Sequence, residues 1–152
     1  MIEMKGYSIQ EMPEKSAIAR AVEVDISLKD AVNVAHFIRG MGADEAVRTM
    51  DEVMEKKKAV PYFRYLDSVS HRKGIGPGRY PVKAAKAFKE TLENAIANAE
   101  FKNLNVENLR VVHVEATKGR MLKKYRPKAH GSAGLFVKDL VNISMVVKEE
   151  SE

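Results

Sequence analysis

Cationic side chains are the groups in this sequence whose type and spacing indicate a chemical task. Residues 56–89 hold ten basic residues and one acid, a charge of +9, and residues 116–138 hold seven basic residues and no acid, a charge of +7. The rest of the chain carries −11, although the whole chain is only +5. A surface built for solubility alone mixes both signs, so these two basic windows favour binding to a large polyanion, with phosphate neutralisation as the main source of affinity.

A membrane surface is the competing polyanion for the second basic window. Binding there would require an amphipathic helix with bulky apolar anchors beside the lysines. Gly119, Pro127, Gly131 and Gly134 argue against a helix in this window. No stretch approaches 18 apolar residues and the N-terminus lacks a signal pattern, so we expect a soluble, cytoplasmic protein with no membrane insertion.

Glycines accompany the cations of the first window. Gly74, Gly76 and Gly78 lie between Arg72 and Arg79. Glycine lets backbone approach backbone and exposes N–H groups to phosphate, whereas an arginine can bind two phosphate oxygens at once. The run is not a P-loop, because no Gly-Lys-Ser/Thr follows. A plain surface turn is the alternative, and the flanking cations favour contact with RNA.

Residues suited to catalysis or metal binding are scarce. The absence of cysteine excludes disulfides, zinc fingers, iron–sulfur ligation and thiol nucleophiles. His113 and Glu115 have the H-x-E spacing of zinc deaminases, but the cysteine ligands are missing. We therefore predict no catalytic residue, no metal site and no cofactor. The alternative is an RNA-processing enzyme that uses His71 or His130 as its acid or base.

The elements around the basic windows must position these side chains. Apolar alternation predicts a strand over residues 18–26, and helical spacing predicts a helix that follows the N-cap Ser27 and ends at Gly40. A second helix is expected over residues 43–58, with acids in its first turn and three lysines in its last, as the helix dipole favours.

A third helix begins at Pro81, and its first turns carry Lys83 and Lys86. Cations at this end oppose the helix dipole, which indicates another reason for their position. The glycines and prolines of residues 60–81 exclude a regular element before this helix. Two strands are expected after it, over residues 109–116 and 141–148.

The connection between these two strands is either a floppy loop or a long hairpin with its tip near residues 127–131. A structureless loop of that length is uncommon in a compact domain. Arms of about a dozen residues would span roughly 35–40 Å. The chain of 152 residues fits one domain. We expect an N-terminal arm over 1–16, a domain over 17–148 with its hairpin at about 116–138, and an acidic tail over 149–152.

Three segments carry a resemblance to a known family. They are residues 59–88, with the GRYP turn into the third helix, residues 94–104, and residues 118–131, with the RPKAHG run. In this order and spacing they resemble the uL22 (L22/L17e) family of large-subunit ribosomal proteins, in its archaeal type. The resemblance covers essentially residues 17–148.

The resemblance implies an α+β fold in which a three-stranded antiparallel sheet packs on three helices and a long β-hairpin projects from it. It implies a structural constituent of the large ribosomal subunit that binds 23S-type rRNA, supports its assembly and contributes its hairpin tip to the wall of the polypeptide exit tunnel. The implied partners are this rRNA, neighbouring ribosomal proteins and, in passing, the nascent polypeptide; structural Mg²⁺ would belong to the rRNA. The alternative is a free RNA chaperone or architectural RNA-binding protein.

Candidate RNA-binding residues follow from the resemblance and the basic windows together. The resemblance implies rRNA contacts of the body at Arg64, His71, Arg72, Lys73, Arg79, Lys83 and Lys86. It implies contacts along the strand that leads to the tip at Arg120, Lys123 and Lys124, and a tunnel-lining tip formed by Tyr125, Arg126, Pro127, Lys128, Ala129, His130, Gly131 and Ser132. The basic windows add Lys56, Lys57, Lys58, Gly76 and Lys118.

The return segment after the tip departs from the family pattern. Ser132 stands where the family usually has arginine, and Lys138 is the only basic residue between the tip and Lys148. The segment is instead apolar. We hypothesise that Phe136, Val137, Leu140 and Val141 pack on a neighbouring protein.

Overall fold

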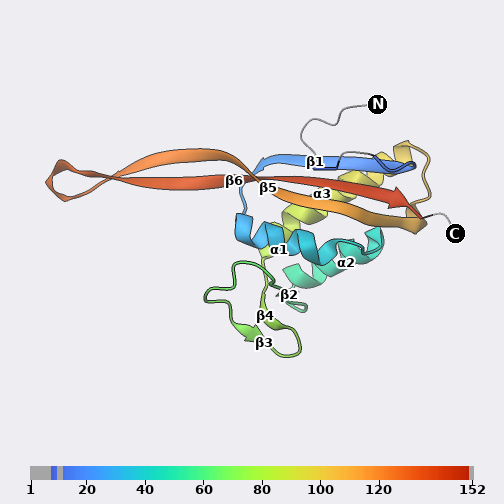
Figure 1. Cartoon of the computed structure of the whole chain (residues 1–152), viewed down its shortest axis with the longest axis horizontal. Coiled ribbons are helices and arrows are strands. Elements are labelled where there is room, and N and C mark those ends of the chain that lie inside the picture. Colours follow the sequence, from blue (N-terminus) through green and yellow to red (C-terminus); the bar gives the residue numbers. More distant parts are fainter. Residues whose placement is uncertain (1–7, 10–11, 151–152) are drawn as a thin grey trace.

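The computed structural model describes residues 8, 9 and 12–150 (Figure 1). The expected N-terminal arm and acidic tail therefore lie partly outside the described residues. A three-stranded antiparallel sheet forms one layer, three α-helices pack beneath it, and a small second sheet lies on the far side of the helices. The expected α+β class is confirmed.

The central strand of the main sheet is its most buried element. The strand order is β1 (Ser16–Val24), β6 (Ala133–Glu149), β5 (Leu109–Pro127), all antiparallel. Alternate residues of β6 point toward the helices, and Val141, Ile143, Met145 and Val147 are fully buried there. Ser144 and Val146 on the opposite face are buried as well, but only the alternate residues belong to the core cluster, and this alternation makes the second half of β6 recognisable from its sequence.

The helices begin and end where their local chemistry requires. Ser27 caps α1 (Leu28–Ile38) by accepting a 3.5 Å hydrogen bond from the backbone N–H of Asp30, and Gly40 follows the helix with φ of +83°, so both expected signals are confirmed. The helix α2 (Ala43–Met54) ends earlier than expected. Its last lysines lie in a turn, because Lys56 adopts φ of +61° and redirects the chain.

The longest helix, α3 (Val82–Phe101), supplies the centre of the hydrophobic core. Phe88 and Leu92 of α3 are fully buried together with Met50 of α2 and Ile38 of α1. Burial of such side chains contributes about 1.5–3 kcal/mol each, so this core stabilises the body that carries the basic segments.

The segment between α2 and α3 contains regular structure, and the expectation that glycine and proline exclude it is wrong. Strands β2 (Val60–Pro61), β3 (His71–Arg72) and β4 (Gly76–Arg79) form a second sheet in the order β2–β4–β3. Pro77 is tolerated because it contributes its carbonyl, which accepts a 2.9 Å bond from the N–H of Tyr62. Gly78 is closely packed, since a Cβ there would lie 2.9 Å from Cδ1 of Ile75 and 3.1 Å from the carbonyl oxygen of Val60.

Strands β5 and β6 continue as a two-stranded hairpin that projects from the body (Figure 1). Their pairing runs from Leu109 opposite Glu149 to Pro127 opposite Ala133, whereas β1 has its last pair at Val24 and Val141. The strand expected over residues 109–116 thus extends eleven residues further, into the segment expected as the hairpin. No residue of 117–139 belongs to the hydrophobic core of the described chain.

Candidate nucleic-acid interface

A buried asparagine holds the first basic segment against the body. Asn33 of α1 is fully buried, and its Oδ1 accepts hydrogen bonds from the backbone N–H groups of Phe63 and Arg64, at 3.0 and 3.2 Å. Its Nδ2 donates to the carbonyls of Arg64 and Lys29, at 3.2 and 2.7 Å. Three of these four bonds fix the backbone at Phe63 and Arg64, and the side chain of Arg64 remains exposed.

The neighbouring Tyr62 adds a second anchor to the same segment. It is buried, and its hydroxyl donates a hydrogen bond to the carboxylate of Asp30 in α1. Burial, together with this bond, raises the pKa of the Tyr62 hydroxyl far above its ordinary value, so the group stays protonated as a donor. Asn33 and Tyr62 thus fix the loop that carries Arg64.

The β3–β4 hairpin presents the next group of predicted RNA-binding residues. The Nε of Arg72 donates to the carbonyl of Gly78 at 3.3 Å, and Nη2 of Arg79 donates to the carbonyl of Ser68 at 3.0 Å. Each guanidinium keeps further donors for a ligand. His71 and Lys73 are exposed beside them, and Gly76 has φ of +72° in the turn.

Several predicted RNA-binding lysines already have a carboxylate partner. Lys118 lies 3.0 Å from Asp139, Lys58 lies 3.7 Å from Glu52, and Lys57 pairs with Glu55, which raises the pKa of the Lys57 ammonium. These pairs are solvent-exposed, and such pairs contribute little to stability because water and salt screen them. A phosphate group can therefore replace the carboxylate at little cost in free energy.

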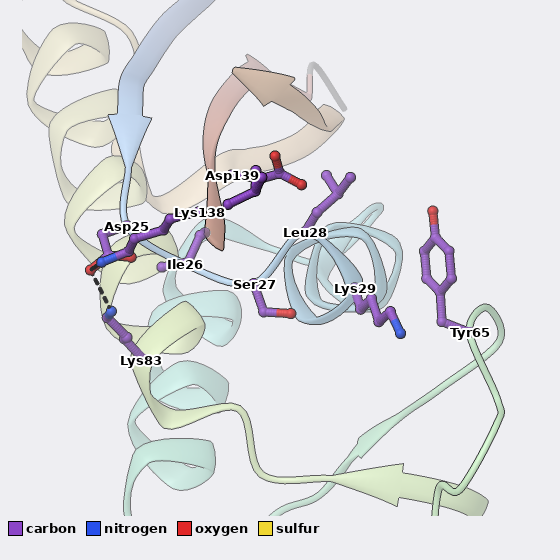
Figure 2. Close-up of a pocket in the computed structure, with 10 residues that line it drawn as sticks. Asp25, Ile26, Ser27, Leu28, Lys29, Tyr65, Lys83, Lys138 and Asp139 are labelled. Atoms are coloured by element: carbon purple, nitrogen blue, oxygen red, sulfur yellow. Dashed lines mark hydrogen bonds and ion pairs between the residues drawn. The ribbon is translucent and has the colours of Figure 1, made fainter. Parts of the chain in front are cut away.

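The root of the long hairpin is tied to the body by one carboxylate. Oδ2 of Asp25, between β1 and α1, lies 2.7 Å from Nζ of Lys138 in β6 and 2.9 Å from Nζ of Lys83 in α3. Figure 2 shows Asp25 between these lysines at one end of a cavity of about 480 Å³, with Tyr65 at the other. Hydrogen bonds from Lys138 and then Lys83 lower the pKa of Asp25 below its ordinary range.

The tip of the hairpin is a tight turn that Ser132 helps to close. The N–H of Lys128 donates to the carbonyl of Ser132 at 2.7 Å, and the hydroxyl of Ser132 donates to the carbonyl of Ala129 at 2.9 Å. His130 and Gly131 both have positive φ, at +56° and +71°. Ser132 therefore has a role in the geometry of this turn.

The tip side chains are outward-facing and almost unpacked. All residues from Arg120 to Ala133 are exposed, including Tyr125 at 69%. The guanidinium of Arg126 lies 4.6 Å from the ring centre of Phe136 across the hairpin. Lys123, Lys124 and Lys128 have no carboxylate within ion-pair distance in the part of the chain that the structure describes.

The return segment divides into a buried half and an exposed half. Val141 is fully buried and Leu140 is 9% exposed, so the hypothesis that these two pack on a neighbouring protein is wrong. They lie where β6 enters the body, and chain neighbours already cover them. Phe136 and Val137 remain exposed, at 46% and 38%.

The structure does not gather the candidate residues into one concave site. Figure 1 places the β2–β4–β3 sheet on one side of the helices and the long hairpin at the end of the main sheet. The cations therefore form two separate surfaces. We name them the loop surface (residues 56–86) and the hairpin surface (residues 118–128). Such an arrangement suits electrostatic contact with an extended ligand that reaches both surfaces.

Sequence reasoning missed Asn33 and Asp25, and only Asn33 gave a local signal. Asn33 is a polar residue on the otherwise apolar face formed by Ala31, Val34, Ala35 and Ile38. The partner of Asp25 in β6 lies 113 positions away, which no local pattern encodes. Within the described residues, no cluster of three or more His, Asp or Glu side chains is placed to hold a metal ion, and no helix is long and apolar enough to cross a membrane.

Comparisons with known proteins point to one family. The family model described as ribosomal protein L22p/L17e matches residues 19–148. A relative from Picrophilus torridus is 66% identical over 149 residues, covering 98% of this chain and 99% of its own length. A relative from Thermoplasma acidophilum is 60% identical over the full length of both chains, and one from Thermofilum pendens is 43% identical over 94% of this chain and 95% of its own. Each is named large ribosomal subunit protein uL22.

Proposed function

Because the chain belongs to the ribosomal protein L22p/L17e family, we propose that it binds large-subunit rRNA through its loop and hairpin surfaces. As a member of this family it is a structural constituent of the large ribosomal subunit and not an enzyme. Beyond this membership, we propose that the chain contacts rRNA and neighbouring proteins inside the subunit.

The observation that carries the proposal is the exposure of cations without internal partners. Arg64, Lys73 and Lys86 on the loop surface, and Lys123 and Lys124 on the hairpin surface, have no carboxylate partner among the described residues. Mixed signs of charge would serve solubility as well, whereas RNA phosphates would release counterions on contact with these cations. By neutralising the phosphates of rRNA segments that meet at this protein, these cations would also support the assembly of those segments.

The hairpin suits a position that a compact domain cannot reach. Its paired strands extend beyond the body, and a paired strand advances about 3.3 Å per residue. We propose that it passes between rRNA helices and that its tip, residues 125–132, contributes to the wall of the exit tunnel. Nascent polypeptide and neighbouring ribosomal proteins are then its further contacts.

RNA binding is tested with matched charge reversals. Lys73→Glu on the loop surface and Lys124→Glu on the hairpin surface are compared with Arg48→Glu on α2, an exposed cation outside both basic windows. We expect each of the first two to weaken binding to large-subunit rRNA and to reduce the slope of log affinity against log salt by about 1–2. Arg48→Glu should change neither. Equal effects of all three variants would contradict binding through these surfaces.

Subunit membership is tested by sedimentation of the tagged chain from its own cells. After a high-salt wash we expect stoichiometric retention in the large-subunit peak. Release at moderate salt, or a free pool at the top of the gradient, would favour the alternative of a free RNA chaperone or architectural RNA-binding protein.

A further inference from the structure

A groove on the loop surface combines cations with apolar walls. It has a volume of about 400 Å³ and lies between the end of α1, the turn after α2, and the β3–β4 hairpin. Its lining consists of Phe37, Lys57, Lys58, Ala59, Pro61, Arg72, Lys73, Ile75 and Tyr80. Four of these are cationic and none is acidic. The volume falls within the range of about 300–1,000 Å³ typical of small-ligand sites.

Two aromatic rings of the groove carry cations near their ring centres. The guanidinium carbon of Arg72 lies 5.2 Å from the ring centre of Tyr80, and Nζ of Lys58 lies 5.7 Å from that of Phe37. Both distances are within cation–π range. Tyr80 with Arg72 thus offers planar surfaces on which a flat heterocycle can stack.

The remaining apolar wall is held in place by the β3–β4 turn. The N–H of Ile75 donates to the carbonyl of Arg72 at 3.3 Å, which closes the turn. Gly78 has no side chain, and the space leaves room for Cδ1 of Ile75. Ile75 therefore packs against Gly78 of the hairpin while 41% of its surface stays exposed.

The charges of the groove are available to a ligand. Lys73 has no acidic partner among the described residues, and the carboxylate partners of Lys57 and Lys58 are exposed. The cavity at the hairpin root is a contrast, because Asp25 and Asp139 line it and Asp25 already binds Lys83 and Lys138. Of the two cavities, the groove beside Tyr80 is therefore the one suited to an anion.

We propose that this groove binds one unpaired nucleotide of RNA. The base stacks on Tyr80 and packs against Ile75, and its phosphate lies between Lys57 and Lys73. A paired base cannot enter, because its faces are covered by the stack, whereas an extruded base brings a free π-face and a flexible phosphate together. The inference rests on the proposed RNA-binding function and adds to it a site selective for unpaired RNA.

The test uses a short RNA that carries one 2-aminopurine, either single-stranded or annealed to its complement. We expect the wild-type chain to quench the 2-aminopurine fluorescence of the single strand by stacking, and Tyr80→Leu to lose this quenching and about tenfold or more in affinity. Tyr65→Leu is the matched control, because Tyr65 is an exposed tyrosine of the same segment, with Lys29 at 5.9 Å from its ring, that lines the other cavity. It should leave both readouts unchanged.

A second variant keeps the test decisive if Tyr80→Leu does not fold. Arg72→Lys preserves the charge and removes the planar guanidinium, so we expect weaker quenching with an almost unchanged salt dependence. If Tyr80→Leu and Tyr65→Leu quench equally while RNA binding still depends on salt, the proposed nucleotide site in the groove is wrong. The proposed RNA-binding function would then stand without it. Equal affinity for the annealed RNA would also overturn the nucleotide site. No RNA binding by the wild-type chain at low salt would overturn the proposed function itself.

Discussion

At the scale of single residues, Asn33 shows how one side chain determines the course of a loop. It is buried, and it satisfies two N–H groups and one carbonyl of a segment 30 positions away, besides the carbonyl of Lys29 in its own helix. This buried amide holds the backbone of Arg64 in position and does not contact a ligand itself. The hydrogen bonds of Asn33 exclude alternative conformations of the loop before a ligand binds.

Replacing Asn33 by alanine should lower the free energy of unfolding by about 2–3 kcal/mol, because the backbone groups of Phe63 and Arg64 lose their partners inside the protein. Urea unfolding followed by circular dichroism measures the change. The control is Asn98→Ala, since Asn98 is exposed and donates a single 2.8 Å bond to the carbonyl of Ile18. A cost for Asn33→Ala no larger than that of the control would contradict the anchoring role.

At the scale of elements, Asp25 joins three segments that are distant in sequence. Its carboxylate connects the β1–α1 link to the start of α3 and to β6 at the hairpin root. It also gives a reason for Lys83 at the N-terminus of α3, where the helix dipole alone disfavours a cation. All three side chains are exposed, so the connection orients the hairpin root more than it stabilises the fold.

The titration of Asp25 should report this connection. Its pKa is lowered in the folded chain, so the ion pairs are present above the pKa of the unfolded chain and are lost as pH falls through the lower folded value. Carboxyl-carbon NMR should therefore show a midpoint below the ordinary aspartate range. Lys138→Met should raise it more than Lys83→Met, because Lys138 makes the larger contribution. A midpoint that neither variant moves would rule out the bridge in solution.

The elements also show where sequence reasoning reaches its limit. Ser27 and Gly40 could be recognised because capping depends on neighbouring residues, and the stripe through Phe88 and Leu92 because a helix buries one face. The outer half of β5 shows no such local pattern, since a two-stranded ribbon exposed on both faces has no reason for apolar alternation, and the expectation of a hairpin there comes from the length of the connection and from the family resemblance. The Asp25 bridge and the groove beside Tyr80 depend on contacts between distant segments, which no local pattern encodes.

At the scale of the whole molecule, the body and the projecting hairpin have different sources of order. The helices and the inner half of the main sheet share one hydrophobic core, which includes no residue of 117–139. Beyond the body the hairpin is held by its own cross-strand pairing, with exposed side chains on both faces. The two parts should therefore respond differently to deletion.

Replacing residues 123–137 by an Asn-Gly turn should leave the body folded. Leu122 and Lys138, which already pair across the hairpin, would then flank a two-residue loop. Asn-Gly favours hairpin loops of this length. We expect the free energy of unfolding to change by less than about 1 kcal/mol, because the removed residues lie outside the core.

The same deletion removes four cations and no acid. The slope of log RNA affinity against log salt should therefore fall by up to about 3. Thermal unfolding and salt titration of RNA binding measure the two effects. A loss of cooperative unfolding would mean that the hairpin is part of the folding unit of the body.

The two-stranded form of the hairpin has a consequence for the chain before it reaches any partner. Beyond the pair of Val24 and Val141, no third strand among the described residues pairs with the hairpin, so β5 and β6 each present a row of unpaired backbone groups along an open edge. Such edges are templates for strand addition by a second copy, and lysines along them oppose that pairing through like-charge repulsion. Lys123, Lys124 and Lys128 would thus oppose the self-association of newly made chains, in addition to the contacts with RNA that we propose for them.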